Sequence, residues 1–158
     1  KYRMQGAQTM PLRWPTGLDY RLVWTGVPAS TAGKLQQFQS ADPKRSYEAL
    51  IRSAAGLVDA WQSASGILAA MPGYVETLRQ FSDDYNLGIF DAGHDKLVAA
   101  ARAAGLVYKP CGAGGGDVGI LLGAHGEKLD EFLAAQPEFG CRALESTLEM
   151  QGVTWEQR

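Results

Sequence analysis

The stretch Lys109-Pro110-Cys111-Gly112-Ala113-Gly114-Gly115-Gly116-Asp117 places four glycines in five positions between two apolar runs. Leu106 to Tyr108 precedes it and Val118 to Leu122 follows it, and both runs are typical of strands. Glycine adopts positive φ and has no Cβ, so such a loop can direct several backbone N–H groups toward one point and admit a ligand closely. Consecutive inward-pointing amides bind anions, most often phosphate. The loop is therefore either a phosphate-binding cradle or a glycine-rich hairpin that only connects two strands.

The apolar pattern along the rest of the chain favours an α+β fold. An alternating run over residues 18–24 predicts a strand, and a capped helix is expected after it, starting at Ser30 or Thr31. Further elements are expected as helices over residues 47–61, 74–85, 91–104 and 126–135, and as one or two strands over residues 143–155. Strands at both ends with helices between them favour a two-layer α+β fold over a doubly wound sheet, in which strands and helices alternate strictly.

Particular residues predict where the helices begin and end. The helix that follows Asp42 has Pro43 near its first position, where the missing N–H costs little. Met71-Pro72-Gly73 is expected to separate two helices, and Asn86 with Gly88 predicts a C-terminal cap. The apolar face of the first of these helices consists of Tyr47, Leu50, Ile51, Ala54, Val58 and Trp61.

Composition limits the class of protein. The chain has 158 residues, a hydrophobic fraction of 46% and a net charge of −2, which suit an ordinary globular domain. This charge gives no reason to expect nucleic acid or an anionic membrane as a partner. Two cysteines without CxxC spacing, with no visible signal peptide and no long apolar run, favour a reducing cytoplasmic setting.

Two short nucleotide-binding motifs are only partly matched. Gly33-Lys34 resembles the end of a P-loop, but Leu35 stands where Ser or Thr is required. Gly114 to Gly119 has the letters GxGxxG. A dinucleotide fingerprint opens a helix, however, whereas this loop leads into a strand pattern. Neither motif therefore predicts a nucleotide site.

The isolated titratable residues form no complete catalytic or metal-binding set. His94 and His125 have no partner ligands at a suitable spacing, so both are expected to face solvent. Cys111 lacks a nearby base and is interpreted as a small lining residue, and Asp83-Asp84 is interpreted as a solvated pair. Asp117 leaves four roles open: holding a metal, capping loop amides, meeting a substrate hydroxyl, or bracing the loop.

Lys109 to Gly119, KPCGAGGGDVG, closely resembles the third conserved motif of the GHMP kinases, above all in the form found in phosphomevalonate kinases. Trp24 to Thr31, WTGVPAST, resembles the WTGxPxST segment early in the C-terminal half of those enzymes. A weaker similarity covers residues 97–105, which lead into the motif strand. These matches occur in the expected order over most of residues 18–122.

The resemblance implies a ferredoxin-like two-layer sandwich, in which an antiparallel sheet packs on helices, over residues 18–158. Residues 1–17 are then an irregular lead-in from an N-terminal domain. The implied activity is ATP-dependent transfer of a phosphoryl group to 5-phosphomevalonate in isoprenoid precursor synthesis. ATP and the phosphorylated substrate are the implied partners, and Mg²⁺ is the implied counter-charge.

Matching the motifs residue by residue also implies the site. The residues that would face the substrate's phosphate are Cys111, Gly112 and Ala113. The phosphate or nucleotide loop would consist of Gly114, Gly115, Gly116 and Asp117. The residues that would line the cleft are Thr25, Gly26, Ser30 and Thr31.

The chain also departs from the family pattern. The family usually has serine where Cys111 stands, so a weak thiol donor replaces a hydroxyl. The family's ATP phosphate loop, of Pro-x-x-x-Gly-Leu-Gly-Ser-Ser-Ala type, does not occur in the 158 residues. The chain alone is therefore expected to be inactive and without catalytic residues, to work with an N-terminal kinase domain, and to expose an apolar surface that favours self-association. The alternatives are mevalonate kinase or another GHMP kinase and, from a different class, a non-catalytic ligand-binding or interaction module.

Overall fold

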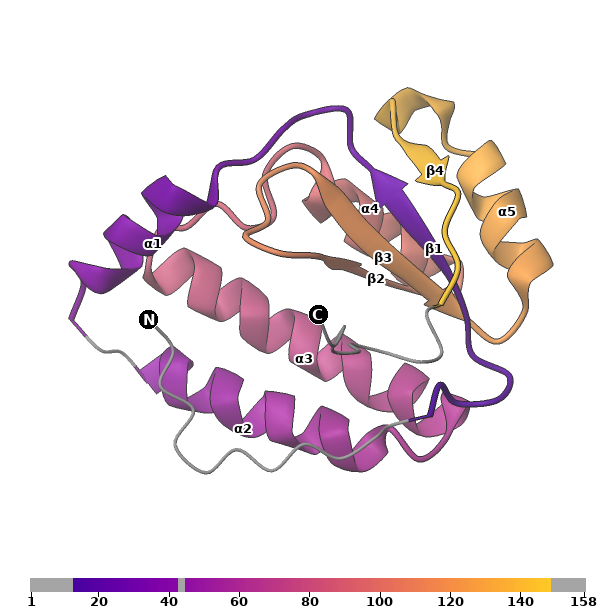
Figure 1. Cartoon of the computed structure of the whole chain (residues 1–158), viewed down its shortest axis with the longest axis horizontal. Coiled ribbons are helices and arrows are strands. Elements are labelled where there is room, and N and C mark those ends of the chain that lie inside the picture. Colours follow the sequence, from indigo (N-terminus) through magenta and orange to yellow (C-terminus); the bar gives the residue numbers. More distant parts are fainter. Residues whose placement is uncertain (1–12, 43–44, 149–158) are drawn as a thin grey trace, which may run out of the picture.

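A four-stranded antiparallel sheet carries helices on both faces (Figure 1). The computed structural model describes residues 13–42 and 45–148, so Pro43, most of the lead-in and any strand beyond residue 148 lie outside the described residues. The elements in chain order are β1 (Asp19–Trp24), α1 (Thr31–Gln39), α2 (Arg45–Ala60), α3 (Ala64–Asp84), α4 (His94–Ala103), β2 (Val107–Pro110), β3 (Val118–Gly123), α5 (Gly126–Ala134), the 3₁₀ turn η1 (Pro137–Phe139) and β4 (Arg142–Leu144).

The strands lie in the order β2-β3-β1-β4, and every neighbouring pair is antiparallel. In chain order, β1 leads through helices to β2, the β2–β3 hairpin holds the glycine loop, and α5 leads to β4 at the other edge. The central pair, β1 with β3, runs in register from Asp19 opposite Gly123 to Trp24 opposite Val118. This β-α-β-β-α-β arrangement is ferredoxin-like, and the expected α+β fold is confirmed.

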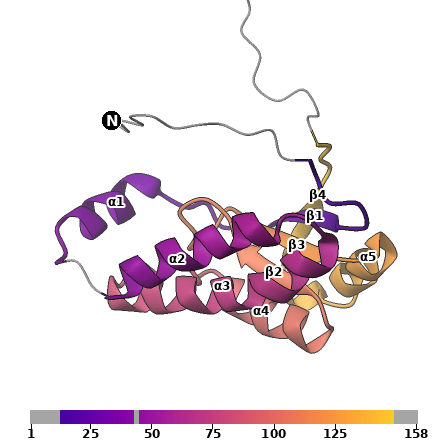
Figure 2. The same cartoon turned by 90° about the horizontal axis from the view of Figure 1, so that it is seen from below.

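Alternation of side chains along the strands divides the core into two clusters. On one face, Tyr108 and Leu121 of the paired strands pack with Leu97 of α4 and with α5. On the other face, Val107 and Leu122 pack with α3, and α2 lies against α3 (Figure 2). The sheet with α4 and α5 makes the expected two-layer unit, and the α2–α3 pair adds helices to the opposite face.

Helix α3 continues through Pro72, so the expected break at Met71-Pro72-Gly73 is wrong. A proline inside a helix removes one backbone hydrogen bond and typically costs about 3 kcal/mol, but Pro72 is exposed to solvent. Buried side chains recur on the inward face at spacings of four, four and three residues: Ile67, Met71, Val75 and Leu78. Each such burial contributes about 1.5–3 kcal/mol, so the packed face holds the helix together across the proline.

The two helices α3 and α4 end at left-handed residues, and the cap predicted at Asn86 is confirmed. Asn86, after α3, has φ 50°, and Leu87 N–H donates to the Ser82 carbonyl at 2.8 Å. Gly105, after α4, has φ 71°. This reversal closes the last turn of each helix and directs the chain back toward the sheet.

The apolar face expected for residues 47–61 is only partly covered. Leu50 packs against the core cluster, whereas Tyr47, Ile51 and Val58 of α2 are 42%, 53% and 52% exposed. Leu35 of α1 is 45% exposed. This surface matches the expected apolar surface, and self-association through it stays a prediction.

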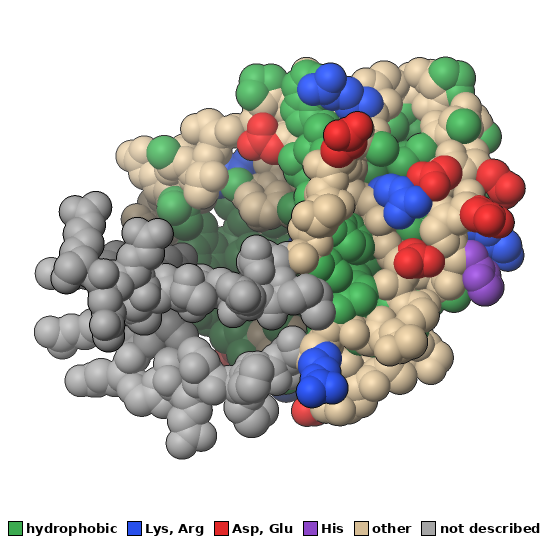
Figure 3. Space-filling model, turned by 45° about the vertical axis from the view of Figure 1, so that its right-hand side comes forward, with side chains coloured by type: hydrophobic (Ala, Val, Ile, Leu, Met, Phe, Trp, Pro, Cys, Tyr) green, Lys and Arg blue, Asp and Glu red, His purple; other side chains and the backbone are tan. Residues whose placement is uncertain are grey.

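The side of the molecule around β4 and α5 carries mixed charges (Figure 3). Basic and acidic side chains lie close together there, with apolar groups between them. Arg21 of β1 donates two hydrogen bonds of 2.7 Å to the Asp130 carboxylate of α5, which lowers the pKa of Asp130. An exposed pair of this kind stabilises a fold only slightly. Within the described part of the chain, no helix is long and apolar enough to span a membrane.

Candidate functional site at the glycine loop

The glycine loop, residues 111–117, joins β2 to β3 and lies at one end of the sheet (Figure 1). Positive φ angles occur at Gly112, Gly114, Gly115, Gly116 and Asp117. Side chains other than glycine rarely adopt this region, so the path of the loop itself requires its composition. The predicted strand–loop–strand setting is confirmed.

The middle of the loop is packed against two neighbouring connections of the chain. Gly115 N–H donates to the Ile89 carbonyl at 2.7 Å. A Cβ at Gly114 would stand 2.5 Å from the Ile89 carbonyl oxygen, and one at Gly116 would stand 2.5 Å from the Val27 carbonyl oxygen. The glycines therefore allow the backbone of the loop to contact the backbone at Ile89, in the connection after α3, and at Val27, in the connection after β1.

Three amides of the loop, those of Gly112, Ala113 and Gly116, have no acceptor within the described residues, whereas those of Cys111, Gly114, Gly115 and Asp117 donate to backbone carbonyls. Gly116 is buried, while Gly112 and Ala113 reach the surface. Gly112 and Ala113 also line a hollow of about 290 Å³. Adjacent N–H groups that open on a hollow without an internal partner can bind an anion. These are two of the three residues predicted to face the substrate's phosphate.

The hollow lies between α1, α3 and the glycine loop. Its volume of about 290 Å³ is near the lower end of the range for small-molecule sites, which is about 300–1,000 Å³. Thr31 and Lys34 of α1 contribute its polar side chains. The remaining wall is apolar and consists of Leu35, Phe38, Leu78, Phe81, Leu87 and Ile89. The site thus combines a small polar end with an apolar body.

Lys34 reaches from α1 to the glycine loop. Its Nζ donates to the Gly114 carbonyl at 2.7 Å and lies 3.2 and 3.3 Å from the carbonyl oxygens of Gly88 and Ala113. Burial lowers its pKa. Motif reasoning misses this contact, because Gly33-Lys34 is only an incomplete P-loop match. The sequence feature that could have indicated this contact is the position of Lys34, one turn into the helix that follows the WTG segment, residues 24–31.

His94 braces the loop from α4, and the expectation that it faces solvent is wrong. Its side chain is completely buried, with Nε2 2.9 Å from the Gly116 carbonyl oxygen and Nδ1 2.9 Å from the Tyr108 hydroxyl. Burial lowers its pKa. Helical spacing could have predicted this burial, because His94, Leu97 and Ala101 share the inward face of α4. His125, in contrast, is exposed as expected.

The WTG segment supports the loop from the side of β1. Thr25 is buried, its N–H donates to the Asp117 carbonyl at 2.9 Å, and its hydroxyl donates to the same oxygen at 3.2 Å. Thr31 lines the hollow, whereas Gly26 and Ser30 are exposed beside it and do not line it. The structure therefore places Thr31 at the hollow and Thr25 beneath the loop.

Cys111 and Asp117 stand at the two ends of the loop. The Cys111 thiol lies 4.0 Å from the Lys109 carbonyl oxygen, and burial raises its pKa. A raised pKa keeps the thiol neutral. Cys111 is adjacent to Gly112 but does not itself line the hollow, so its interpretation as a lining residue stays a prediction. Asp117 is exposed, and its backbone N–H donates to the Val27 carbonyl at 2.6 Å. This is a backbone contact, so the four roles of the Asp117 carboxylate stay open.

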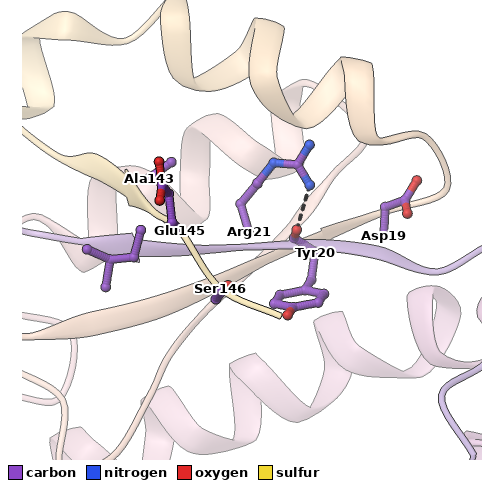
Figure 4. A pocket seen from close by; sticks show the side chains of 7 residues that line it. Asp19, Tyr20, Arg21, Ala143, Glu145 and Ser146 are labelled. Atoms are coloured by element: carbon purple, nitrogen blue, oxygen red, sulfur yellow. Dashed lines mark hydrogen bonds between the residues drawn. The ribbon is translucent and has the colours of Figure 1, made fainter. Parts of the chain in front are cut away.

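A second hollow, of about 340 Å³, lies beside β1 and the chain after β4 (Figure 4). Figure 4 shows the Arg21 side chain hydrogen-bonded to the Tyr20 carbonyl, at 2.8 Å, and the same guanidinium binds Asp130. Arg21 is thus already paired, and no residue predicted for the site lines this hollow. The glycine loop remains the candidate site.

Comparison with known proteins relates the chain to one kinase family. No model of a protein family matches the chain. A phosphomevalonate kinase from Streptomyces sp. (strain CL190) is 36% identical over 117 residues, which are 68% of this chain and 31% of that relative. The chain is homologous to phosphomevalonate kinase. It spans less than a third of the length of this relative.

Solved structures show the same fold. The chain superposes on Streptococcus pneumoniae phosphomevalonate kinase in complex with phosphomevalonate and AMPPNP, with a TM-score of 0.68 and 22% identity, covering 81% of this chain and 38% of that one. A Lin0012 protein from Listeria innocua gives a TM-score of 0.75 at 20% identity, covering 85% and 40%. The fold is that of the C-terminal region of phosphomevalonate kinase, a GHMP kinase.

Proposed function

We propose that this chain forms the substrate-phosphate side of the cleft of an ATP-dependent phosphomevalonate kinase. The observation that carries the proposal is the pair of amides at Gly112 and Ala113, which have no acceptor among the described residues and belong to residues that line a hollow of about 290 Å³. Homology to phosphomevalonate kinase supports it. The Streptococcus pneumoniae relative is described in complex with phosphomevalonate and an ATP analogue.

In the proposed reaction, an oxygen of the 5-phosphate of phosphomevalonate attacks the γ-phosphorus of ATP. The bond from that phosphorus to the oxygen bridging to the β-phosphate breaks, and the products are 5-diphosphomevalonate and ADP. Such transfers depend on positioning and charge neutralisation rather than on covalent chemistry by the protein. The proposed part of this chain is to hold substrate phosphate oxygens on the amides of Gly112 and Ala113, with Cys111 beside them. Gly114 to Gly116 hold the loop in place.

The proposal assigns ATP and Mg²⁺ to a second domain. The chain lacks the family's ATP phosphate loop. Among residues 13–42 and 45–148, no group of three or more His, Cys, Asp or Glu side chains could hold a metal ion. Since Mg²⁺ in kinases is held largely by substrate phosphates and water, no residue of this chain is assigned to it and no step of the reaction is derived through it. Residues 18–158 would act as a C-terminal domain, inactive without its ATP-binding partner.

The test is an assay of ADP release with the chain supplied together with the ATP-binding domain. We expect turnover with 5-phosphomevalonate and none from the chain alone. A panel that includes mevalonate separates the members of the GHMP class. Lack of turnover with 5-phosphomevalonate would refute the proposal, and a preference for mevalonate would reassign the substrate. Activity of the chain alone would show that it does not need a separate ATP-binding domain.

A further inference from the structure

The ammonium group of Lys34 carries a positive charge that no carboxylate of the described residues contacts directly. Its three hydrogen-bond acceptors are all backbone carbonyls. Carbonyl oxygens satisfy the donors but carry no net charge. No carboxylate of the described residues lies within 4.0 Å of Nζ. Asp91 acts on this charge only from beyond that distance, and a partly buried cation without a direct ion pair favours the approach of an anion.

This charge lies next to the unpartnered amides. Ala113 belongs to both features, because its carbonyl oxygen is 3.3 Å from Lys34 Nζ and its N–H has no acceptor among the described residues. Lys34, Gly112 and Ala113 also line the same hollow. An anion bound by the two amides would thus lie beside the ammonium group, with N–H donors on one side and a full positive charge on the other.

Two of the three hydrogen bonds made by Lys34 are long enough to be replaced by bonds to a phosphate. The contact with Gly114 is short, at 2.7 Å, whereas those with Gly88 and Ala113 are long, at 3.2 and 3.3 Å. A charge-assisted bond to phosphate is stronger than either long contact. The lysine stem is flexible enough to move its head by a small distance.

We propose that Lys34 is the residue of this chain that recognises the phosphate of a small phosphomonoester. On binding, the ammonium exchanges its long contacts with Gly88 and Ala113 for phosphate oxygens and keeps its bond to Gly114. The apolar wall formed by Leu35, Phe38 and Phe81 then covers a short aliphatic body. This inference rests on the proposed function and names the side chain that distinguishes a phosphorylated substrate from an unphosphorylated one.

A purely structural role for Lys34 makes a different prediction. If the lysine only fastens α1 to the loop, its removal lowers the stability of the free protein but leaves the preference for phosphorylated ligands unchanged. If it binds phosphate, its removal abolishes that preference. The two roles are therefore separated by comparing ligands that differ only in the phosphate.

The experiment is a titration of the full chain, followed by calorimetry and by the amide NMR signals of Gly112 and Ala113. The probes are 5-phosphomevalonate, mevalonate and pyrophosphate. The variants are Lys34→Met, Lys34→Arg and the control Lys128→Met, which removes an equal charge from an exposed site on α5. We expect both phosphorylated probes to shift the two amide signals. Lys34→Met should weaken their binding by about tenfold or more, the size of one charge-assisted hydrogen bond, and Lys34→Arg should restore part of it.

Each outcome decides one of the two proposals. Equal affinity of wild type and Lys34→Met for 5-phosphomevalonate would overturn the role of Lys34 and leave the proposed function standing. Binding of pyrophosphate but not of 5-phosphomevalonate, lost in Lys34→Met, would support the role of Lys34 and refute the proposed substrate. Binding of neither probe at Gly112 and Ala113, or an equal loss in Lys128→Met, would overturn the inference.

Discussion

The Nε2 atom of His94 lies 2.9 Å from the carbonyl oxygen of Gly116, which ties helix α4 to the glycine loop. A carbonyl oxygen only accepts hydrogen bonds, so Nε2 carries the proton. Burial lowers the pKa of His94, so at neutral pH its Nδ1 is unprotonated and accepts a hydrogen bond from the Tyr108 hydroxyl, 2.9 Å away. The imidazole is therefore neutral, and the chain Tyr108–His94–Gly116 holds the loop from inside the core.

Removing the Tyr108 hydroxyl leaves the buried Nδ1 of His94 without a donor. We expect Tyr108→Phe to lower the free energy of unfolding by about 1–3 kcal/mol, the cost of an unsatisfied buried polar group. Urea denaturation measures this change. Tyr20→Phe is the control, because the Tyr20 ring is only partly buried and packs against Trp14. Similar small changes in the two variants would contradict the hydrogen-bond chain.

The neutral state of His94 predicts a pH dependence of stability. Its pKa in the folded protein is lowered from 6.5, mainly by burial and also by the charge of Lys34, against the opposing effects of the Gly116 hydrogen bond, Asp95 and Asp117. Between the lowered folded pKa and 6.5, the unfolded chain binds more protons than the folded one. The free energy of unfolding therefore falls as pH drops below about 6.5.

Two histidine variants isolate this effect. His94→Gln should be less stable at neutral pH and should lose the part of the pH dependence that His94 contributes. His125→Gln, at an exposed position, should keep the full dependence. Urea denaturation of the three proteins at about pH 7.5, 6.5 and 5.5 gives the comparison. An unchanged pH dependence in His94→Gln would show that His94 is not buried in its neutral form.

The glycines of the loop are not equivalent, and alanine substitutions should separate them. Gly116 has φ 143°, and an added Cβ would stand 2.5 Å from the Val27 carbonyl oxygen. Gly112 has φ 61° and nothing within 4 Å of an added Cβ. Gly112→Ala should therefore cost only the left-handed penalty of about 1–2 kcal/mol.

Gly116→Ala should cost more, because the backbone contact with Val27 must also open. Thermal unfolding of both variants measures the difference in stability. The amide NMR signals of the loop show whether the change spreads to Ala113. Equal losses of stability would mean that the loop is free to move away from the connection after β1.

The Cys111 thiol tests the proposed position of the ligand. Burial raises the pKa of both Cys111 and Cys141, so both should react with iodoacetamide more slowly than an exposed thiol at neutral pH. We expect 5-phosphomevalonate to slow the alkylation of Cys111 further and to leave Cys141 unchanged, as measured by mass spectrometry. Equal protection of both cysteines, or of neither, would remove Cys111 from the ligand's surroundings.

The sequence predicts the strands beside the glycine loop and the end of α3, because residues close together in the chain determine these features. The runs on either side of the glycine loop are short and apolar, as in buried strands, and Asn86 tolerates the left-handed conformation that ends α3. Pro72 misleads because its local effect is to break a helix. The buried face of α3 outweighs that effect, and only tertiary packing reveals this.

The site is harder to predict because its parts come from distant segments. The glycine loop is visible as composition, but Lys34 and His94 reach it from α1 and α4. In the sequence, His94 has no neighbouring metal ligand or catalytic partner that would mark it as part of a site. Its burial can be predicted only from the helix face that it shares with Leu97 and Ala101. Lys34 gives even less, because only the fold brings α1 to the loop.

The pairing of β1 with β3 also affects how the protein is made. Asp19 lies opposite Gly123 and Trp24 opposite Val118, about a hundred positions apart along the chain. Contacts of such high sequence separation form slowly, whereas the neighbouring helices α2 and α3 can meet early. During synthesis on the ribosome, β1 waits with both edges unpaired, which is a state prone to aggregation and a target for chaperones. Translation of the glycine loop and of β3 thus gives β1 a partner strand within this fold and brings the loop to the WTG segment in the same step.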